Sequence, residues 1–160
     1  MVDVIYNTWW IDSSSTIHVS NSLQGMRNPR KPMPSEQCIY SGNKMCSHVE
    51  AVGICSLVLS SGFNLNLKKT FYVPSFSRNL ISISRLIPFG YSFNFLETSF
   101  DLFYKSDLVG NGTLFDSLFF INLKNDTTHN VVMHVDTSVK RYVIMKIPLC
   151  YGTEDWGISL

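Results

Sequence analysis

Residues 63–73 read Phe-Asn-Leu-Asn-Leu-Lys-Lys-Thr-Phe-Tyr-Val, and this run decides the fold class. Its first, third and fifth residues are apolar and alternate with Asn, Asn and Lys, which is the period of a strand with one buried face. Pro74 follows directly and is expected to end the strand, because proline cannot donate a ladder hydrogen bond. Ser-Ser-Gly at 60–62 predicts a turn that joins this strand to another strand-like run at 49–59. The centre of the chain is therefore predicted to be β-structure.

Similar short runs occupy most of the first three quarters of the chain. We expect further strands at 8–11, 17–19, 37–40, 91–95, 100–104 and 118–123, and glycine- and asparagine-containing turns at 41–43 and 110–112. The spacing of Leu80, Ile83 and Leu86 predicts one short helix within 79–86. Many short strands at this spacing predict an all-β domain over 1–124, either a small barrel or a sandwich. The strand pattern then fades, and 125–160 is predicted to be an irregular tail.

Composition limits the classes of function. The chain has 160 residues, of which 45% are hydrophobic, enough for the core of one compact domain. A net charge of +1 gives no electrostatic reason to expect nucleic acid or an anionic membrane as a partner. No apolar run is long enough to cross a bilayer, and the first residues do not resemble a signal peptide. We therefore expect an intracellular, cytoplasmic protein whose four cysteines are reduced.

The cysteines and basic residues predict no separate binding site. Cys38, Cys46, His48 and Cys55 lack the paired two-residue spacing of zinc sites, so we expect no metal. No glycine-rich phosphate-binding motif is present, and we expect no cofactor. The basic residues within 27–31 lie beside prolines and are expected to form a solvated loop rather than a nucleic-acid site.

The stretch that carries chemistry is 9–16, Trp-Trp-Ile-Asp-Ser-Ser-Ser-Thr. An apolar strand that runs into Asp12 and then into small hydroxyl residues presents one carboxylate on a tight loop. Alone, this signal is weak, because an aspartate followed by serine commonly caps the backbone of a turn.

Two separated motifs resemble the protease segment of copia-type retrotransposon Pol polyproteins. Residues 9–25 are similar to its opening, Trp-x-hydrophobic-Asp-Ser/Thr-Gly-Ala-Ser/Thr-x-His, and residues 71–86 are similar to its Val-Pro-x-x-x-x-Asn-Leu-hydrophobic-Ser signature. The resemblance covers about 9–123. It implies a small closed retropepsin-like β-barrel with one short helix, acting on polypeptides as a homodimer in which each subunit supplies one catalytic aspartate.

The resemblance also assigns the site residues. Asp12 of each subunit would be catalytic, and Ser13 would brace the loop through hydrogen bonds to its dimer mate. The hairpin around 41–44, with Gly42 and Asn43, would be the flap that covers substrate. By the same similarity, His18 is expected to be structural. Two apposed carboxylates share a proton, so that one can activate water while the other polarises the scissile carbonyl.

The chain departs from the family motif at two positions: Ser14 stands in place of glycine, and Ser15, a less disruptive change, in place of alanine. Glycine serves where the backbone needs a positive φ or where two chains approach closely. A serine there is expected to push the two aspartate loops apart and reduce activity. We therefore expect a degenerate endopeptidase, and the alternative is a catalytically inactive barrel that is inert or serves as a binding module.

The tail differs from the segment that follows the protease in such polyproteins. That segment resembles Met-Leu-Trp-His-Arg-x-Leu-Gly-His-Ile-Ser, and permitted codons for 149–158, read in the neighbouring frame, can encode a similar stretch. We expect that a frameshift produced this C-terminus and that residues after about 137 are loosely attached.

Overall fold

The computed structural model describes residues 7–124, so the predicted tail at 125–160 and its frameshift origin lie outside the described residues. This part of the chain is mostly strand, with one short α-helix, as predicted. The strands are β1 (Trp9–Asp12), β2 (His18–Ser20), β3 (Met26–Arg30), β4 (Cys38–Tyr40), β5 (Cys46–His48), β6 (Ala51–Val58), β7 (Asn64–Tyr72), β8 (Asn79–Ser82), β9 (Tyr91–Phe95), β10 (Ser99–Tyr104), β11 (Asp107–Phe115) and β12 (Leu118–Ile121). The helical turns are η2 (Pro34–Glu36), α1 (Ile83–Leu86) and η3 (Ile87–Phe89).

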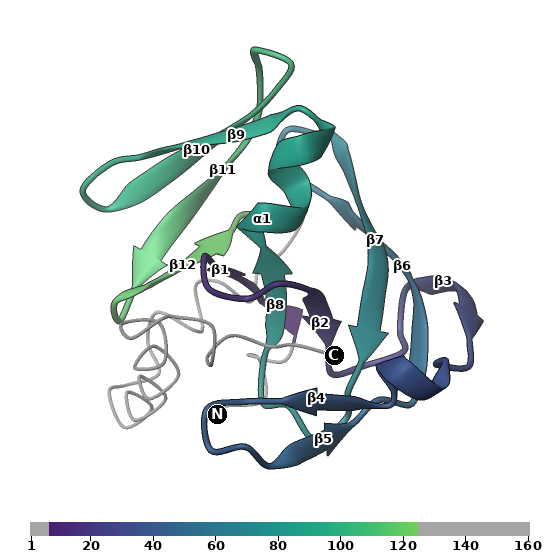
Figure 1. Cartoon of the computed structure of the whole chain (residues 1–160). Helices are drawn as coiled ribbons and strands as arrows, with labels where there is room; N and C mark the ends of the chain where they lie inside the picture. Colours follow the sequence, from purple (N-terminus) through teal and green to yellow (C-terminus); the bar gives the residue numbers. More distant parts are fainter. Residues whose placement is uncertain (1–6, 125–160) are drawn as a thin grey trace.

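Ten strands form one sheet, in the order β3-β6-β7-β2-β8-β1-β12-β11-β10-β9 (Figure 1). The pairs β1–β8 and β2–β7 are parallel, and the other pairs are antiparallel. The sheet curls back on itself, because Leu59 after β6 forms a bridge with Leu123 after β12. The Lys124 N–H also donates to the Val58 carbonyl at 2.9 Å. These bonds join segments that are far apart in the strand order, as expected for a barrel.

The sheet buries side chains on both faces. Trp9 and Ile11 of β1 belong to a first core cluster, with Leu65, Phe100 and others, while Trp10 belongs to a second. This division follows from the alternation of side chains along a strand. The small β4–β5 sheet contributes Ile39 to the second cluster. Within residues 7–124, no helix has the length and apolar character needed to cross a membrane.

The helix predicted within 79–86 is wrong in its first half. Residues Asn79–Ser82 form β8, and only Ile83–Leu86 form α1. All four residues of β8 are buried, and the strand pairs in parallel with β1. A strand buried on both faces shows no polar alternation, so apolar spacing alone cannot distinguish it from a helix.

The turn predicted at 110–112 is also wrong, because these residues lie inside β11. Their glycines serve close packing rather than a change of chain direction. A Cβ on Gly112 would overlap the Phe100 ring and the Phe120 carbonyl, and a Cβ on Gly110 would overlap Leu59. Glycine inside a strand marks such close approaches.

The hairpin predicted around 41–43 is confirmed, and it contains a disulfide. Antiparallel β4 and β5 are joined by a turn in which the Lys44 N–H donates to the Ser41 carbonyl at 2.8 Å. Cys38 and Cys46 form a disulfide across the hairpin, with 5.4 Å between their Cα atoms. The expectation that all cysteines are reduced is therefore wrong for this pair, which the strand register brings together. Cys55 is a buried thiol whose pKa burial raises to about 11.

Candidate active site

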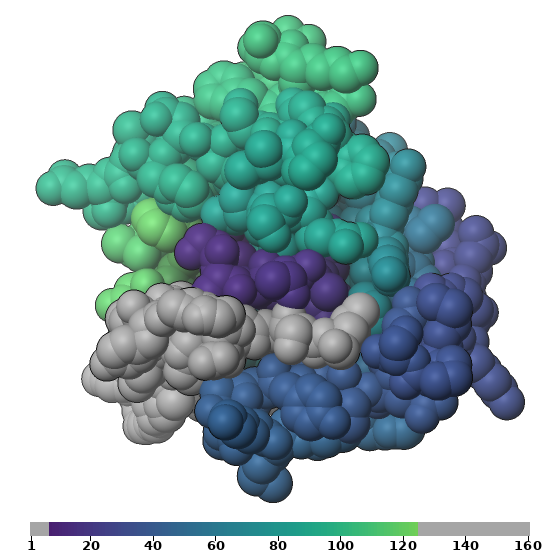
Figure 2. Space-filling view, viewed as in Figure 1, coloured from purple at the N-terminus to yellow at the C-terminus, as the bar shows by residue number. Residues whose placement is uncertain are grey.

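Asp12 is the last residue of β1, a strand whose other three residues are buried. It pairs with Ser82 in the parallel β1–β8 ladder and is followed by the loop that leads to β2. Asp12, expected on a tight loop, is instead the last residue of β1, and the loop to β2 begins directly after it. Figure 2 shows the N-terminal segment (purple) reaching the surface next to the teal and green part of the molecule.

The Asp12 carboxylate is half-buried and accepts hydrogen bonds from its own loop. The Ser14 N–H donates to Asp12 Oδ1 at 2.9 Å, and the Ser14 hydroxyl donates to the same atom at 3.0 Å. Burial raises the pKa of Asp12 above its usual value, although hydrogen bonds from Ser14 and from the Ser15 backbone act in the opposite direction. A carboxyl in this environment holds a proton to higher pH than an exposed aspartate.

Ser14 does not adopt the left-handed conformation that favours glycine. Several described residues other than glycine have a positive φ, and Ser14 is not among them. A glycine at this position could be needed for a positive φ or for the close approach of two chains. The first reason does not apply within this subunit. The remaining reason is the close approach of a second chain.

Buried hydroxyl groups hold the base of the loop. The Ser15 hydroxyl donates to the Ile17 carbonyl at 2.6 Å, and the Ser82 hydroxyl donates to the Ser15 carbonyl at 2.6 Å. The Ser82 N–H donates to His18 Nδ1 at 3.0 Å, which gives His18 the structural role that was predicted. Burial, followed by the charge of Arg85, lowers the pKa of His18 to about 3, so that the ring is neutral near pH 7.

Asn79 and Arg78 explain why the two motifs occur together, a connection that the sequence does not reveal. Asn79 is buried, accepts from the Asn21 N–H at 2.9 Å and donates to the Thr8 carbonyl at 3.2 Å. It thereby ties the start of β1 to the end of β2. The guanidinium of Arg78 stacks 4.4 Å from the centroid of the Trp10 ring. The second motif thus holds the strand that carries the candidate aspartate.

The other predicted site residues lie on two separate elements. Ser13 is exposed beside Asp12. Gly42 is half-buried and Asn43 exposed at the tip of the β4–β5 hairpin. Asn43 Oδ1 accepts from the Ser41 hydroxyl at 3.1 Å and from the Met45 N–H at 3.0 Å, and these bonds shape the turn. Their roles toward a substrate remain predictions.

Metal ligands do not gather in the part of the chain that the structure describes. No group of three His, Cys, Asp or Glu side chains within 7–124 could hold a metal ion. The sulfur atoms of Cys38 and Cys46 are bonded to each other.

The comparisons with known proteins point to one family. Residues 9–91 match the family model described as the Pol polyprotein, beta-barrel domain. No curated protein and no solved structure matches the chain. The match spans both motifs, the Asp12 loop, the β4–β5 hairpin and most of the large sheet. Because it covers more than half of the chain, this protein belongs to the Pol polyprotein β-barrel domain family.

Proposed function

We propose that this chain is the aspartic endopeptidase region of a copia-type retrotransposon Pol polyprotein, with a retropepsin-like barrel that works as a homodimer. Its substrate would be a polypeptide, namely the polyprotein itself. The observation that carries the proposal is the Asp12 carboxyl, which ends a buried strand and has a pKa raised by burial. We place the activity in the cytoplasm.

In this proposal, the Asp12 side chains of two subunits face each other and share one proton. The ionised carboxylate takes a proton from a bound water, and the protonated one polarises the carbonyl of the scissile peptide bond. Burial favours this arrangement, because it raises the pKa of Asp12 before a second negative charge raises it further. Ser13 would bond to its dimer mate, and Gly42 and Asn43 would lie at the flap over the substrate.

The activity of this chain would be lower than that of a relative with glycine at position 14. Ser14 places a Cβ and a hydroxyl beside the carboxylate, where the loop of the second subunit must approach. A displacement of about 1 Å between the reacting groups costs roughly a hundredfold in rate. Ser14 therefore supports the description of this endopeptidase as degenerate.

A second candidate is a catalytically inactive barrel. The observation that favours it is the pair of hydrogen bonds from Ser14 to one oxygen of Asp12. These bonds make the carboxylate part of its own loop, a structural role that needs no second subunit.

Sedimentation and peptide cleavage by the same purified chain separate the two candidates. The endopeptidase predicts a concentration-dependent dimer and cleavage of a peptide library, both measured at high protein concentration. Asp12→Asn should abolish cleavage, whereas Asp116→Asn, a change at an exposed turn aspartate, should preserve it. A chain that stays monomeric at every concentration, or cleavage that survives Asp12→Asn, would refute the proposal.

A further inference from the structure

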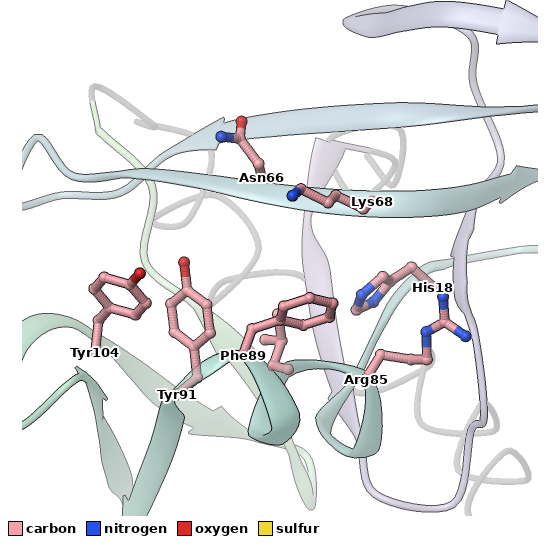
Figure 3. A pocket seen from close by; sticks show the side chains of 8 residues that line it. His18, Asn66, Lys68, Arg85, Phe89, Tyr91 and Tyr104 are labelled. Atoms are coloured by element: carbon pink, nitrogen blue, oxygen red, sulfur yellow. The ribbon is translucent and has the colours of Figure 1, made fainter.

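A cavity of about 240 Å³ lies apart from Asp12, between β7 on one side and the α1–η3–β9 segment on the other (Figure 3). It is slightly smaller than the range of about 300–1,000 Å³ that holds drug-sized ligands. Its size therefore suits a molecule with one ring and one attached group. His18 and Arg85 lie at one end, Tyr91 and Tyr104 at the other, and Lys68 between them (Figure 3).

Two positively charged side chains line this cavity, Arg85 at one end and Lys68 near its middle. None of the described lining residues is acidic. Among residues 7–124, the ion pairs found are those of Glu36 with Arg30 and Lys69, so Lys68 and Arg85 lack a carboxylate partner there. Two cations beside a partly enclosed space attract an anion, and such a space screens their charge less than open solvent does.

The neutral polar groups of the cavity also act as hydrogen-bond donors. His18 Nδ1 accepts from the Ser82 N–H, so the proton of the neutral ring is on Nε2. Asn66 Oδ1 already accepts from the Ser56 hydroxyl at 2.7 Å and from Arg27 Nη2 at 3.2 Å, which leaves its amide N–H groups as donors. A set of donors around two cations matches the acceptor oxygens of a phosphate or carboxylate.

The other end is aromatic. The Tyr91 and Tyr104 rings lie 4.7 Å apart between centroids, at an interplanar angle of 38°. Burial raises the pKa of Tyr91, so its hydroxyl is protonated at neutral pH. The Phe89 ring continues this wall, and Lys68 Nζ lies 5.7 Å from its centroid. Such rings offer a surface for one further planar group.

We propose that this cavity binds a small aromatic anion, in which a planar ring carries one phosphate or carboxylate group. The anionic group would lie beside His18, between Lys68 and Arg85, whose flexible side chains would turn toward it, and the ring would pack against Tyr91 and Phe89. The inference is independent of the proposed endopeptidase activity, because the cavity does not include Asp12.

The test is a titration of the full chain with phenyl phosphate. Binding is measured by calorimetry and by changes in the NMR signals of His18 and the tyrosines. We expect saturable binding at one site and a shift of the His18 Nε2 signal. Arg85→Gln and Lys68→Gln should each weaken binding about tenfold or more, since each removes a charge-assisted contact. The matched control Lys31→Gln, which neutralises an exposed lysine away from the cavity, should bind like the unchanged chain.

Further arms test the aromatic part and the source of the ligand. Inorganic phosphate should bind about tenfold more weakly than phenyl phosphate, and Tyr91→Leu should remove that difference while Tyr91→Phe retains it. Tighter binding of O-phosphotyrosine than of phenyl phosphate would support the proposal and identify a phosphotyrosine side chain as the source of the ligand. Absence of saturation with phenyl phosphate would overturn it. So would equal binding by the Arg85→Gln, Lys68→Gln and Lys31→Gln variants, each verified as folded by its melting curve.

Discussion

Replacement of Ser14 by glycine tests the idea that one side chain limits the activity of this domain. Ser14→Gly removes the hydroxyl that donates to Asp12 Oδ1 at 3.0 Å and the Cβ beside it, but leaves the backbone N–H bond at 2.9 Å. With the Cβ gone, two aspartate loops could approach more closely. If Ser14 separates them by about 1 Å, Ser14→Gly should raise peptidase activity roughly a hundredfold.

The same change should cost stability by a predictable amount. Loss of the hydroxyl bond costs about 1 kcal/mol. Glycine adds about 0.5–1 kcal/mol through the greater freedom of the unfolded chain. Ser14→Ala removes the same bond but keeps the Cβ, so it should lose the first amount alone and gain little activity. The alanine variant therefore separates the effect of the hydrogen bond from that of bulk.

The assay is cleavage of a peptide library at high protein concentration and at acidic to neutral pH, where the pair of carboxyls can hold one proton. Denaturant unfolding of the same preparations gives the stabilities. The gain should vanish when Ser14→Gly is combined with Asp12→Asn. Equal rates for the unchanged chain and Ser14→Gly would refute the claim that Ser14 limits activity. Equal gains for Ser14→Ala and Ser14→Gly would show that the hydrogen bond, rather than the Cβ, is responsible.

Three further predictions concern stability. Burial raises the pKa of Asp12, so the folded state loses stability as pH rises through that pKa. In dilute protein, Asp12→Asn should therefore raise the Tm at neutral pH. Below the ordinary aspartate pKa of about 3.9, the same change should have no effect on the Tm. The hydrogen bond from Arg30 is the main cause that lowers the pKa of Glu36 to about 2. The stability that ionised Glu36 contributes to the fold is therefore complete above the ordinary glutamate pKa and is lost as pH falls toward 2. Glu36→Gln should accordingly lower the free energy of unfolding in urea by about 2 kcal/mol at neutral pH. This is less than for a fully buried ion pair, because the Arg30 side chain is 46% exposed. The control Glu50→Gln, at an exposed glutamate, should cost almost nothing. Reduction of the Cys38–Cys46 disulfide should cost about 2–3 kcal/mol of stability, seen as a lower Tm in the presence of reductant. A control variant with serine at both positions should show no change in Tm with reductant.

The parts of the fold that could be predicted are those with an exposed face. In β7, Leu65 and Leu67 are fully buried and Asn64 and Asn66 exposed, which is the alternation that the sequence displays. Strand β8 has no exposed face, and its apolar spacing is equally compatible with a helix. The glycines of β11 resemble a turn in the sequence, because their packing partners Phe100 and Leu59 come from other strands and loops.

The candidate site divides in the same way. Asp12 could be singled out as a candidate, because a strand, an aspartate and a serine-rich loop are contiguous in the sequence. The contacts that hold its loop could not, since Ser82 and Ser15 are 67 positions apart. The cavity could not be predicted either, because Lys68 and Arg85 come from different elements and neither belongs to a motif with a known ligand.

The contacts around Asp12 indicate where in this domain a loss of activity would originate. The buried network of Ser15, Ser82 and His18 holds the loop within one subunit, and Ser14 fits the loop without positive φ. One subunit therefore folds its aspartate loop without strain at Ser14. Any penalty from Ser14 must then arise where a second loop approaches, so it should appear in dimer formation and cleavage rather than in the folding of the monomer. This is why Ser14→Gly is expected to lower stability and raise activity in the same protein.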